Sequence, residues 1–564
     1  MKFQPTAFSG KGASFFSLLI FVLGAIVSGG ATDVVTYHND NSRSGLNAQE
    51  TILTTANVNS SSFGKLFTMP VDGKVDAEPL YLSAVSINGV THNVLYAVTE
   101  NDSVYAFDAD AGTLLWQVSM LQSGETPSGD FGCGQISPQI GITSTPVIDR
   151  RSGTHGTIYV VAMSKNSASY FQRIHGLDLT TGQEEFGGPV AVQAQYPGTG
   201  DNSQNGYVIF DPKQYAERQG LLLIGHAIYT AWTSHCDFRP YTGWLIGYNE
   251  SSLAQSSVLN LTPNGNEGAI WQSGAGMASD GTNIFFMDAN GTFDTTLDAN
   301  GFPINGDYGN AFMKVSTTKH QLAVADYFNM YNTVAESDSD EDLGSGGVVL
   351  FPAMNDSGGM TRYLALGAGK DSNIYIVDRN NMGKFNPNND NAIYQEIDGA
   401  LGGGMWSMPA RLGNSVYFGP QGNKLMQFKF SQARLATTPA SKSSVTFPYP
   451  GTTPSVSANG SKNGIVWAIA HSDPNDVLHA YDATNLAKEL YNSSQAAGGR
   501  DQLGQASHFG TPMIVNGKVY VGTNNNVTVF GLLGSEHSGS SLLESEKVRA
   551  LTHIRYATDA LVAP

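Results

Sequence analysis

Hydrophobic and polar positions alternate along this chain in short runs that are separated by polar turns. In VLYAVTENDSVYAFDADAGTLLW (94–116), two alternating runs flank the turn-like ENDS, and a glycine comes before the closing tryptophan. A period of two is typical of β-strands with one buried face, and two such runs joined by a short polar connection are typical of a hairpin. The stretch therefore predicts a hairpin followed by an outer strand that ends near Trp116.

The same hairpin pattern recurs along most of the chain. Several repeats have an aspartate after the second strand, and a short apolar run such as DAEPLYL or GTPMIVN often comes before the hairpin. Four-stranded units that recur along a chain predict a β-propeller, in which each sheet buries its faces against its neighbours. We therefore predict an all-β chain, an eight-bladed β-propeller of four-stranded antiparallel blades. The units begin near Glu78, Thr145, Tyr207, Ile270, Val348, Trp406, Pro454 and Thr511.

Particular residues in these repeats have predicted structural roles. In AFDADAGTLLW, the Asp108 side chain can cap the turn and Gly112 can supply a backbone with positive φ. Trp116 would then fill the wedge between two blades. The last unit lacks a fourth strand, and GKLFTMPV (64–71) is available to supply it. We expect this segment to close the ring, because an unpaired edge would otherwise remain.

Composition restricts the classes of partner. The 564 residues are 41% hydrophobic and 14% charged, which suits a large buried core, and the formal net charge is −18. This charge repels phosphate backbones and anionic membranes, so nucleic acid is not an expected partner. No C-x-x-C-H motif occurs, which excludes covalently attached haem. The histidines lack the spacing of a zinc site, and no G-x-S-x-G elbow is present.

The N-terminus predicts export. Lys2 and Lys11 precede the apolar run FFSLLIFVLGAIV (15–27), and small residues follow it up to Ala31. A membrane anchor is the alternative, but this run of 13 residues is shorter than the roughly 20 that a membrane-spanning helix needs. We therefore predict a secreted protein, extracellular or periplasmic, without stable membrane insertion.

These patterns divide the chain into three parts, namely a signal peptide at 1–31, the propeller at 32–533 and a C-terminal tail at 534–564. The tail has the composition either of a short amphipathic helix packed on the ring or of a mobile segment. Of the two cysteines, Cys133 and Cys236, an oxidising compartment predicts one disulfide that closes a loop of about 100 residues. Two free buried thiols are the alternative.

Several stretches resemble the quinoprotein alcohol dehydrogenase family, whose members are eight-bladed propellers that hold pyrroloquinoline quinone and calcium. YHNDNSRSGLNAQETILTTANVNSSSFGKLFTMPVDGKVDAEPLYL is similar to the family's N-terminal segment and first inner strand, and GKDSNIYIVDRNNMG is similar to its lysine-bearing hairpin. The resemblance covers residues 33–532. It implies oxidation of an alcohol or sugar-like hydroxyl, with the electrons passed to an external acceptor.

The resemblance also implies a set of site residues. Asp307 in GDYGN matches the catalytic aspartate, which would take the alcohol proton, and Lys370 in GAGKD matches a basic residue that faces the quinone carbonyls. Calcium needs several oxygen ligands, and the matched ligands are Asp237, Asn290 and Asp307. The bound cation would polarise the quinone carbonyl. The other matched quinone contacts are Asp76, Thr143, Ser234, Trp271 and Trp406.

Three features depart from the family's pattern. The adjacent cysteine pair over the quinone is absent, Met405 stands where a polar quinone contact is usual, and Asp237 is shorter than the usual glutamate. An extracellular binding or scaffold propeller without cofactor is therefore the alternative function. The acidic stretch SDSDEDLGSGG (337–347) lacks the closing glutamate of a calcium loop, so we expect it to be a solvated acidic loop.

Overall fold

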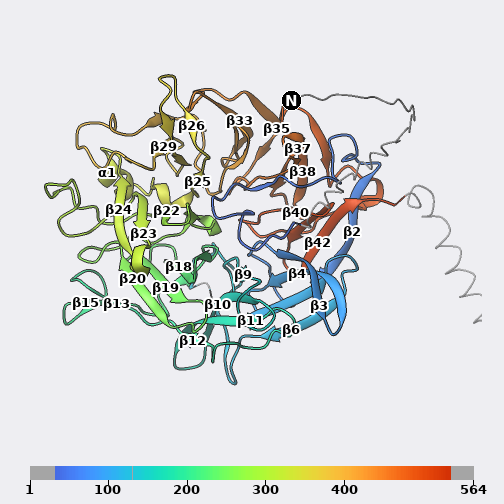
Figure 1. The fold of residues 1–564 in the computed structure, drawn as a ribbon, viewed down its shortest axis with the longest axis horizontal. Coiled ribbons are helices and arrows are strands. Elements are labelled where there is room, and N and C mark those ends of the chain that lie inside the picture. Colours follow the sequence, from blue (N-terminus) through green and yellow to red (C-terminus); the bar gives the residue numbers. More distant parts are fainter. Residues whose placement is uncertain (1–31, 130, 535–564) are drawn as a thin grey trace, which may run out of the picture. The chain divides into compact units, whose positions relative to one another are not determined.

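The alternating runs form strands that pair into antiparallel sheets (Figure 1). The computed structural model describes residues 32–129 and 131–534. The prediction of an all-β chain is confirmed, since strands dominate these residues and their one α-helix is short, α1 (Thr333–Asp338). The predicted signal peptide and, beyond Gly534, the predicted tail lie outside the described residues.

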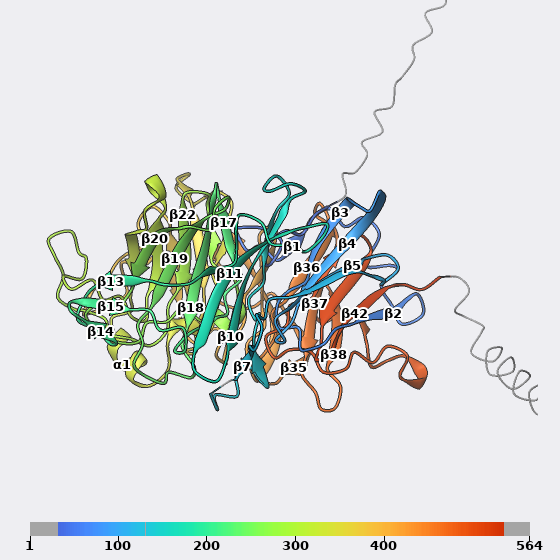
Figure 2. The same ribbon diagram turned by 90° about the horizontal axis from the view of Figure 1, so that it is seen from below.

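The main sheets follow one another along the chain, and their strands are mostly paired in sequence order. In Figure 2, long strands of different sheets run between the same two ends, so their connecting segments gather at these ends. The first sheets contain β3 (Leu80–Ile87), β4 (Val90–Val98), β5 (Ser103–Asp108) and β6 (Leu114–Ser119); then β7 (Thr126–Gly129), β8 (Gln139–Ile140), β9 (Val147–Asp149), β10 (Thr157–Lys165), β11 (Tyr170–Asp178) and β12 (Val190–Ala191); then β16 (Ala216–Glu217), β17 (Leu222–Ile224), β18 (Ala227–Thr233), β19 (Trp244–Asn249) and β20 (Gln255–Asn260); then β21 (Ala278–Ser279), β22 (Asn283–Met287), β23 (Phe312–Ser316) and β24 (Ala323–Phe328).

The later sheets have the same organisation, and the final one takes a strand from near the start of the chain. They contain β25 (Val349–Leu350), β28 (Leu364–Gly367), β29 (Ile374–Asp378) and β30 (Gln395–Ile397); then β31 (Ala410–Leu412), β32 (Ser415–Phe418), β33 (Asn423–Ser431), β34 (Arg434–Leu435) and β35 (Ser441–Phe447); then β36 (Ser455–Asn459), β37 (Lys462–Ala470), β38 (Val477–Asp482) and β39 (Glu489–Asn492), joined by β1 (Leu46–Asn47); then β40 (Met513–Val515), β41 (Lys518–Gly522), β42 (Asn526–Leu532) and β2 (Phe63–Pro70).

One predicted repeat boundary is wrong. Tyr207 lies in a separate three-stranded sheet, and the repeat begins after it, at β16 and β17. The inserted strands alternate just as blade strands do, so the pattern alone did not distinguish them. The smaller elements are β13 (Gln195–Pro197), β14 (Ser203–Gln204), β15 (Tyr207–Ile209), β26 (Met354–Asn355), β27 (Thr361–Arg362) and the 3₁₀ turns η1 (Gln272–Gly274), η2 (Thr318–His320), η3 (Leu343–Ser345) and η4 (Ala497–Gly499).

The turn of the first repeat folds as predicted. Asp108 Oδ1 accepts hydrogen bonds from the backbone N–H groups of Asp110 at 2.9 Å and Ala111 at 2.8 Å. Gly112 has a φ of +71°, and a Cβ at this position would lie 2.8 Å from the Phe67 ring. Glycine is therefore required here both by the backbone conformation and by the close approach of Phe67.

Trp116 fills the space between the first two sheets. Its Nε1 donates a hydrogen bond to the carbonyl of Leu179, which directly follows β11, at 3.1 Å. Its ring also lies 5.9 Å from the ring of Tyr96 in β4, between centroids. The predicted structural role of Trp116 is confirmed by these contacts with both sheets.

The last sheet is completed by the N-terminal strand. β2 pairs antiparallel with β42, so the closing strand predicted at 64–71 is confirmed with a shift of one residue (Figure 1). Phe63 at the start of β2 is fully buried. Its ring meets Tyr491 edge-on at 4.9 Å and Trp467 in a tilted arrangement at 5.4 Å, between ring centroids. The closing strand thus contributes to the core as well as to the ladder.

A polar segment, residues 34–47, joins the main sheets to one another. It forms hydrogen bonds to the first strand of each four-stranded repeat, which is β9 in the second sheet and β17 in the third. Examples are the bonds from Ile148 N to Val35 O and from Leu350 N to Ser42 O, both at 2.9 Å. No side-chain alternation is needed for such contacts, because the backbone makes most of them. The partners in the first strands are Tyr81, Ile148, Leu223, Ser279, Leu350, Arg411, Val456 and Ile514.

Arg43 anchors this segment. Its side chain is fully buried, and the guanidinium donates to Met277 O, Thr36 Oγ1 and Tyr37 O, each at 2.7 Å. Burial lowers the pKa of Arg43 to about 10, so the group stays charged at neutral pH. Burying a charge is costly unless the group is hydrogen-bonded, and these three acceptors reduce that cost. Among the described residues, no helix has the length and apolar character that crossing a membrane requires.

The closing strand offers a matched pair of substitutions. Phe63→Ala removes a fully buried ring and should lower the free energy of unfolding by about 3–5 kcal/mol. Leu66→Ala on the same strand removes a side chain that is 37% exposed and should have a much smaller effect. Urea unfolding measures both. Equal effects of the two variants would contradict a structural role for the buried face of β2.

Candidate functional site

A cavity of about 450 Å³ opens where loops from several sheets meet. In each sheet, the segment before the first strand and the turn between the second and third strands lie at the same end, because successive strands are antiparallel. Lys370 comes from such a turn, between β28 and β29, and we call this space the Lys370 cavity. Its lining includes Cys133, Gln135, Ile136, Ile140, Ser234, Cys236, Asp237, Trp271, Asn290, Asp340, Asp342, Lys370, Trp406 and Tyr449.

The polar centre of the cavity is a network around Lys370. The ammonium lies 2.6 Å from Asp342 Oδ1 and also contacts Asp340. Asn290 Nδ2 donates to Asp340 Oδ1 at 2.7 Å. The Asn290 side-chain oxygen is buried and has no hydrogen-bond partner among the described residues. Asp342 Oδ2 is a second buried oxygen without such a partner, so the network leaves two acceptors free next to the ion pair.

Burial and neighbouring charges shift the pKa values of both members of the ion pair, Lys370 and Asp342. Burial alone would lower the pKa of Lys370, but the carboxylates of Asp342 and Asp340 outweigh it and raise this pKa above its usual value. Burial raises the pKa of Asp342, and Lys370 offsets only part of the rise, while Asp340 and Asp237 add to it. The Asp342 side chain is 1% exposed. A carboxylate of raised pKa beside an ammonium is typical of acid–base sites.

Aromatic rings form another part of the wall. The indole of Trp406 meets the ring of Tyr449 edge-on at 5.5 Å between centroids. Trp271 is held edge-on by Phe509 at 5.4 Å. Both tryptophans line the Lys370 cavity, so a planar ligand would meet flat apolar faces as well as the charged network.

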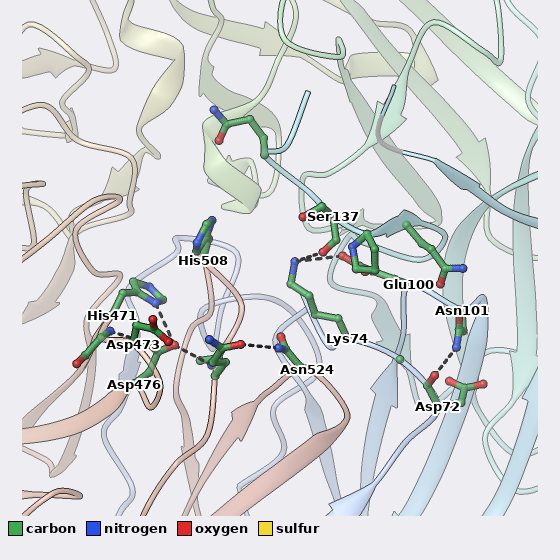
Figure 3. A pocket seen from close by; sticks show the side chains of 17 residues that line it. Asp72, Lys74, Glu100, Asn101, Ser137, His471, Asp473, Asp476, His508 and Asn524 are labelled. Atoms are coloured by element: carbon green, nitrogen blue, oxygen red, sulfur yellow. Dashed lines mark hydrogen bonds and ion pairs between the residues drawn. The ribbon is translucent and has the colours of Figure 1, made fainter. Parts of the chain in front are cut away.

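Six of the predicted site residues come together in this cavity, and three do not line it. Thr143 is fully buried and its hydroxyl donates to Glu217 O at 2.9 Å. Asp76 forms an ion pair with Lys74 at 3.3 Å, and Lys74 lines a neighbouring cavity (Figure 3). The six that line the Lys370 cavity are Ser234, Asp237, Trp271, Asn290, Lys370 and Trp406.

Asp307, the predicted base and calcium ligand, is the third residue outside the lining. Its carboxylate accepts a hydrogen bond from the backbone N–H of Asn264 at 2.9 Å, and burial raises its pKa to about 6. The residue itself is 3% exposed. In this position the carboxylate holds the loop that contains Asn264.

Asp342 is the carboxylate that the sequence reading missed. The expectation of a solvated loop at 337–347 is wrong for Asp342, which is 1% exposed, whereas Asp340 beside it is exposed. The position of Asp342 in the sequence could have indicated its place in the cavity. It comes shortly before the first strand of a repeat, as the predicted site residues Trp271 and Trp406 do. The acidic composition of the stretch hid this position, since a run of charges is usually solvated.

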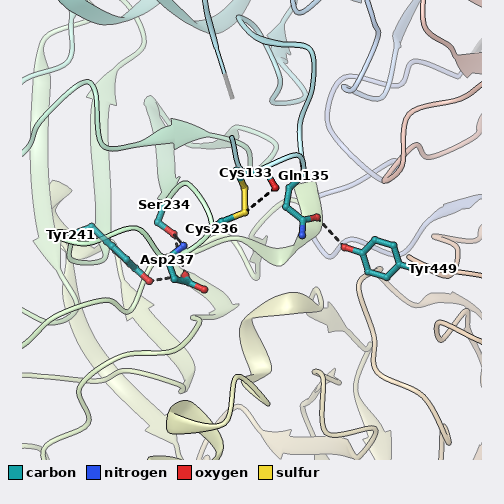
Figure 4. The surroundings of a disulfide bond; sticks show 7 residues. All are labelled: Cys133, Gln135, Ser234, Cys236, Asp237, Tyr241 and Tyr449. Atoms are coloured by element: carbon teal, nitrogen blue, oxygen red, sulfur yellow. Dashed lines mark hydrogen bonds between the residues drawn. A yellow bond between two sulfur atoms is a disulfide. The ribbon is translucent and has the colours of Figure 1, made fainter. Parts of the chain in front are cut away.

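Asp237 is oriented by its own loop (Figure 4). Its Oδ1 accepts hydrogen bonds from the hydroxyls of Tyr241 at 2.7 Å and Ser234 at 3.2 Å. The backbone of Asp237 has a φ of +56°, which is uncommon for a residue other than glycine. The loop after β18 therefore directs both Ser234 and Asp237 to the cavity wall.

A disulfide lies in the same wall (Figure 4). Cys133, from the segment between β7 and β8, is bonded to Cys236 in the loop after β18, so the predicted disulfide is confirmed. Two residues along, Gln135 accepts a hydrogen bond from the Tyr449 hydroxyl at 2.9 Å. The segment around residues 133–135 is thereby joined to two other sheets across the cavity.

The donor set is compatible in kind with a hard cation. Carboxylates of Asp237, Asp340 and Asp342 line the cavity together with the free Asn290 oxygen, and calcium prefers such ligands. Within the described chain, however, no three His, Cys, Asp or Glu side chains converge into a ready metal site. A cation would therefore need ligands beyond these carboxylates, such as the Asn290 oxygen, water or a bound small molecule.

Comparisons with known proteins identify the fold. No family model and no curated protein matches the chain. A quinohemoprotein alcohol dehydrogenase from Comamonas testosteroni aligns with a TM-score of 0.57 at 12% identity, over 90% of this chain and 82% of that one. A second, from Pseudomonas putida HK5, aligns with a TM-score of 0.56 at 12% identity, over 89% and 80%. A europium-containing methanol dehydrogenase gives 0.56 at 12% identity, over 89% and 98%. The chain shares its propeller fold with these dehydrogenases, and the resemblance inferred from the sequence is confirmed at the level of fold.

Removal of the disulfide should lower stability. The bond joins residues 103 apart, and on the chain-entropy model the double change Cys133→Ala and Cys236→Ala should cost up to about 4 kcal/mol. Unfolding by guanidinium under non-reducing conditions measures this loss, with the parent protein in reductant as the control. Mass spectrometry of a non-reduced digest should find the two cysteine peptides linked, and two free thiols would contradict the bond.

Proposed function

We propose that this chain is a secreted quinoprotein-type dehydrogenase, an eight-bladed propeller that oxidises an alcohol or sugar-like hydroxyl. The observation that carries the proposal is the buried pair of Lys370 and Asp342 in the wall of a cavity with aromatic faces. The shared fold with alcohol and methanol dehydrogenases supports it. Export through a signal peptide at 1–31 fits the presence of a disulfide.

In this proposal the Lys370 cavity holds pyrroloquinoline quinone. Trp271 and Trp406 offer apolar faces to a planar ring system, and Ser234 offers a hydroxyl. Lys370 provides the positive charge that stabilises an oxygen gaining electron density. Asp76 and Thr143 are left out of the contact set, because the Thr143 hydroxyl is bonded to Glu217 and Asp76 is paired with Lys74.

Calcium would bind beside the quinone. Asp237, Asp340 and the free oxygen of Asn290 are the proposed protein ligands. Lys370 alone does not neutralise the three carboxylates that line the cavity, so a divalent cation would reduce their repulsion. When bound, the quinone and its cation supply the hydride acceptor and its polarisation.

Asp342 is the proposed base in place of Asp307. A base must reach the hydroxyl of a substrate in the cavity, and Asp342 is a residue of the cavity wall. Lys370 holds it at 2.6 Å and would stabilise the negative charge until the proton arrives from the alcohol. Asp307 has no such access, because it does not line the cavity.

A binding or scaffold propeller without cofactor is the second candidate. It is favoured by the state of Lys370, whose charge is already matched by Asp340 and Asp342. The sequence also lacks adjacent cysteines, and Met405 is fully buried. The two functions differ in whether the folded protein binds the quinone at all.

Paired aspartate substitutions test the dehydrogenase. Asp342→Asn keeps the shape and an oxygen but removes the proton acceptor, so reduction of a dye by an alcohol should fall by about 10²-fold or more. Quinone binding, followed by absorbance at millimolar calcium, should survive. The matched change Asp307→Asn should leave turnover nearly intact.

The outcomes distinguish Asp342 from Asp307 as the base, and a dehydrogenase from a scaffold protein. Loss of turnover in Asp307→Asn alone would return the catalytic role to Asp307. A folded protein that binds no quinone would favour the scaffold function.

The raised pKa of Asp342 predicts the acidic limb of the rate profile. The base acts in its ionised form, so kcat/KM should fall as the pH drops through its pKa. Because burial raises this pKa, the fall should occur above the pH of about 4 at which an ordinary aspartate titrates. A rate that stays constant down to pH 4 would contradict Asp342 as the base.

A further inference from the structure

A second cavity, of about 600 Å³, lies next to the Lys370 cavity (Figure 3). It is formed by segments before β3 and β40, by the segment between β7 and β8, and by the turns β4–β5, β37–β38 and β41–β42. These parts belong to the first two sheets and the last two sheets. We call it the His508 cavity. Its polar lining includes Asp72, Lys74, Glu100, Asn101, Gln135, Gln139, His471, Asp473, Asp476, Gln505, His508 and Asn524.

We propose that the His508 cavity binds a neutral, polyhydroxylated ligand of the size of a mono- or disaccharide. Amide and imidazole side chains are the largest group in the lining, and the apolar side chains are few, chiefly Pro138 and Ala506. A sugar hydroxyl both donates and accepts hydrogen bonds, which amides and imidazoles can each match. The volume lies within the usual range for small-ligand sites, about 300–1,000 Å³.

Several of these groups are free to bind a ligand. Within residues 32–129 and 131–534, the ring nitrogens of His508 and the side-chain amide of Gln139 make no hydrogen bond to the protein. Gln505 uses its oxygen to accept from Asn524 Nδ2 at 3.1 Å, which leaves its own amide hydrogens available. The lining therefore offers both donors and acceptors that the protein itself does not use.

The charges of the lining disfavour an anionic ligand. Lys74 lies 3.3 Å from Asp76 and 3.2 Å from Glu100, so its charge is already matched. Asp473 and Asp476 add negative charge on the opposite side. A phosphate or carboxylate would be repelled, whereas a neutral hydroxyl compound would not.

The two cavities share a wall. Gln135 lines both of them, and it is bonded to Tyr449, which lines the Lys370 cavity. The rings of Tyr449 and His508 meet edge-on, 6.4 Å apart between centroids. A sugar in the His508 cavity would thus lie beside the proposed quinone, and its role as the substrate, though not its binding, rests on the proposed function.

Binding is tested on the full folded protein without quinone. Titration calorimetry with glucose and maltose should detect both, whereas glucose 6-phosphate and 1-propanol should bind at least about tenfold more weakly. His508→Ala removes an exposed imidazole from the cavity wall and should weaken sugar binding about tenfold. The matched control is His226→Ala, because the His226 side chain is 79% exposed and lines neither cavity.

Each outcome bears on one proposal. Absence of sugar binding, equal weakening by both histidine variants, or preference for the cationic glucosamine over glucose would overturn the sugar site. If quinone binds and simple alcohols reduce the dye while sugars do not bind, the dehydrogenase stands and the sugar site falls. Sugar binding in a protein that binds no quinone would support the site and remove its role in oxidation.

Discussion

The arrangement of the sheets depends on one stretch of backbone, residues 34–47, which hydrogen-bonds to the first strand of each main sheet in turn. A ring of sheets has no interior of its own to fix the angle between neighbours, because each sheet packs only against the next. The segment supplies a common partner for all of them. The buried guanidinium of Arg43 holds it in place through three hydrogen bonds of 2.7 Å.

This common partner explains why side chains distant in sequence share one cavity. When the first strands are held in register, the residues just before them and those in the following turns lie at the same end. Trp271, Asp342 and Trp406 lie just before the first strand of a sheet, and Lys370 lies in the turn between a second and a third strand. The adjacent His508 cavity arises from the same geometry in the first two sheets and the last two sheets.

The sequence was sufficient for the fold and for part of the site. Alternating runs, the capped turn at Asp108 and the closing strand could be predicted, because each follows from local pattern or from the need to pair an edge. The role of segment 34–47 could not be predicted, because contacts made by the backbone produce no periodic pattern of apolar side chains in the sequence. Asp342 was missed because its burial depends on Lys370, which is near it only in the folded chain. Asp307 matched the family's motif, but a motif does not show that its carboxylate accepts a hydrogen bond from Asn264 outside the Lys370 cavity.

The pairing of β2 with β42 also has a consequence for biosynthesis. The ribosome releases β2 early, but its partner is among the last strands described, so the nascent chain must keep a strand edge unpaired through most of translation. Contacts between such distant positions form late and expose the chain to aggregation. A chain that is exported unfolded would benefit from this delay, because the ring would still be open during translocation. Final closure would then take place in the oxidising compartment where Cys133 and Cys236 can also pair.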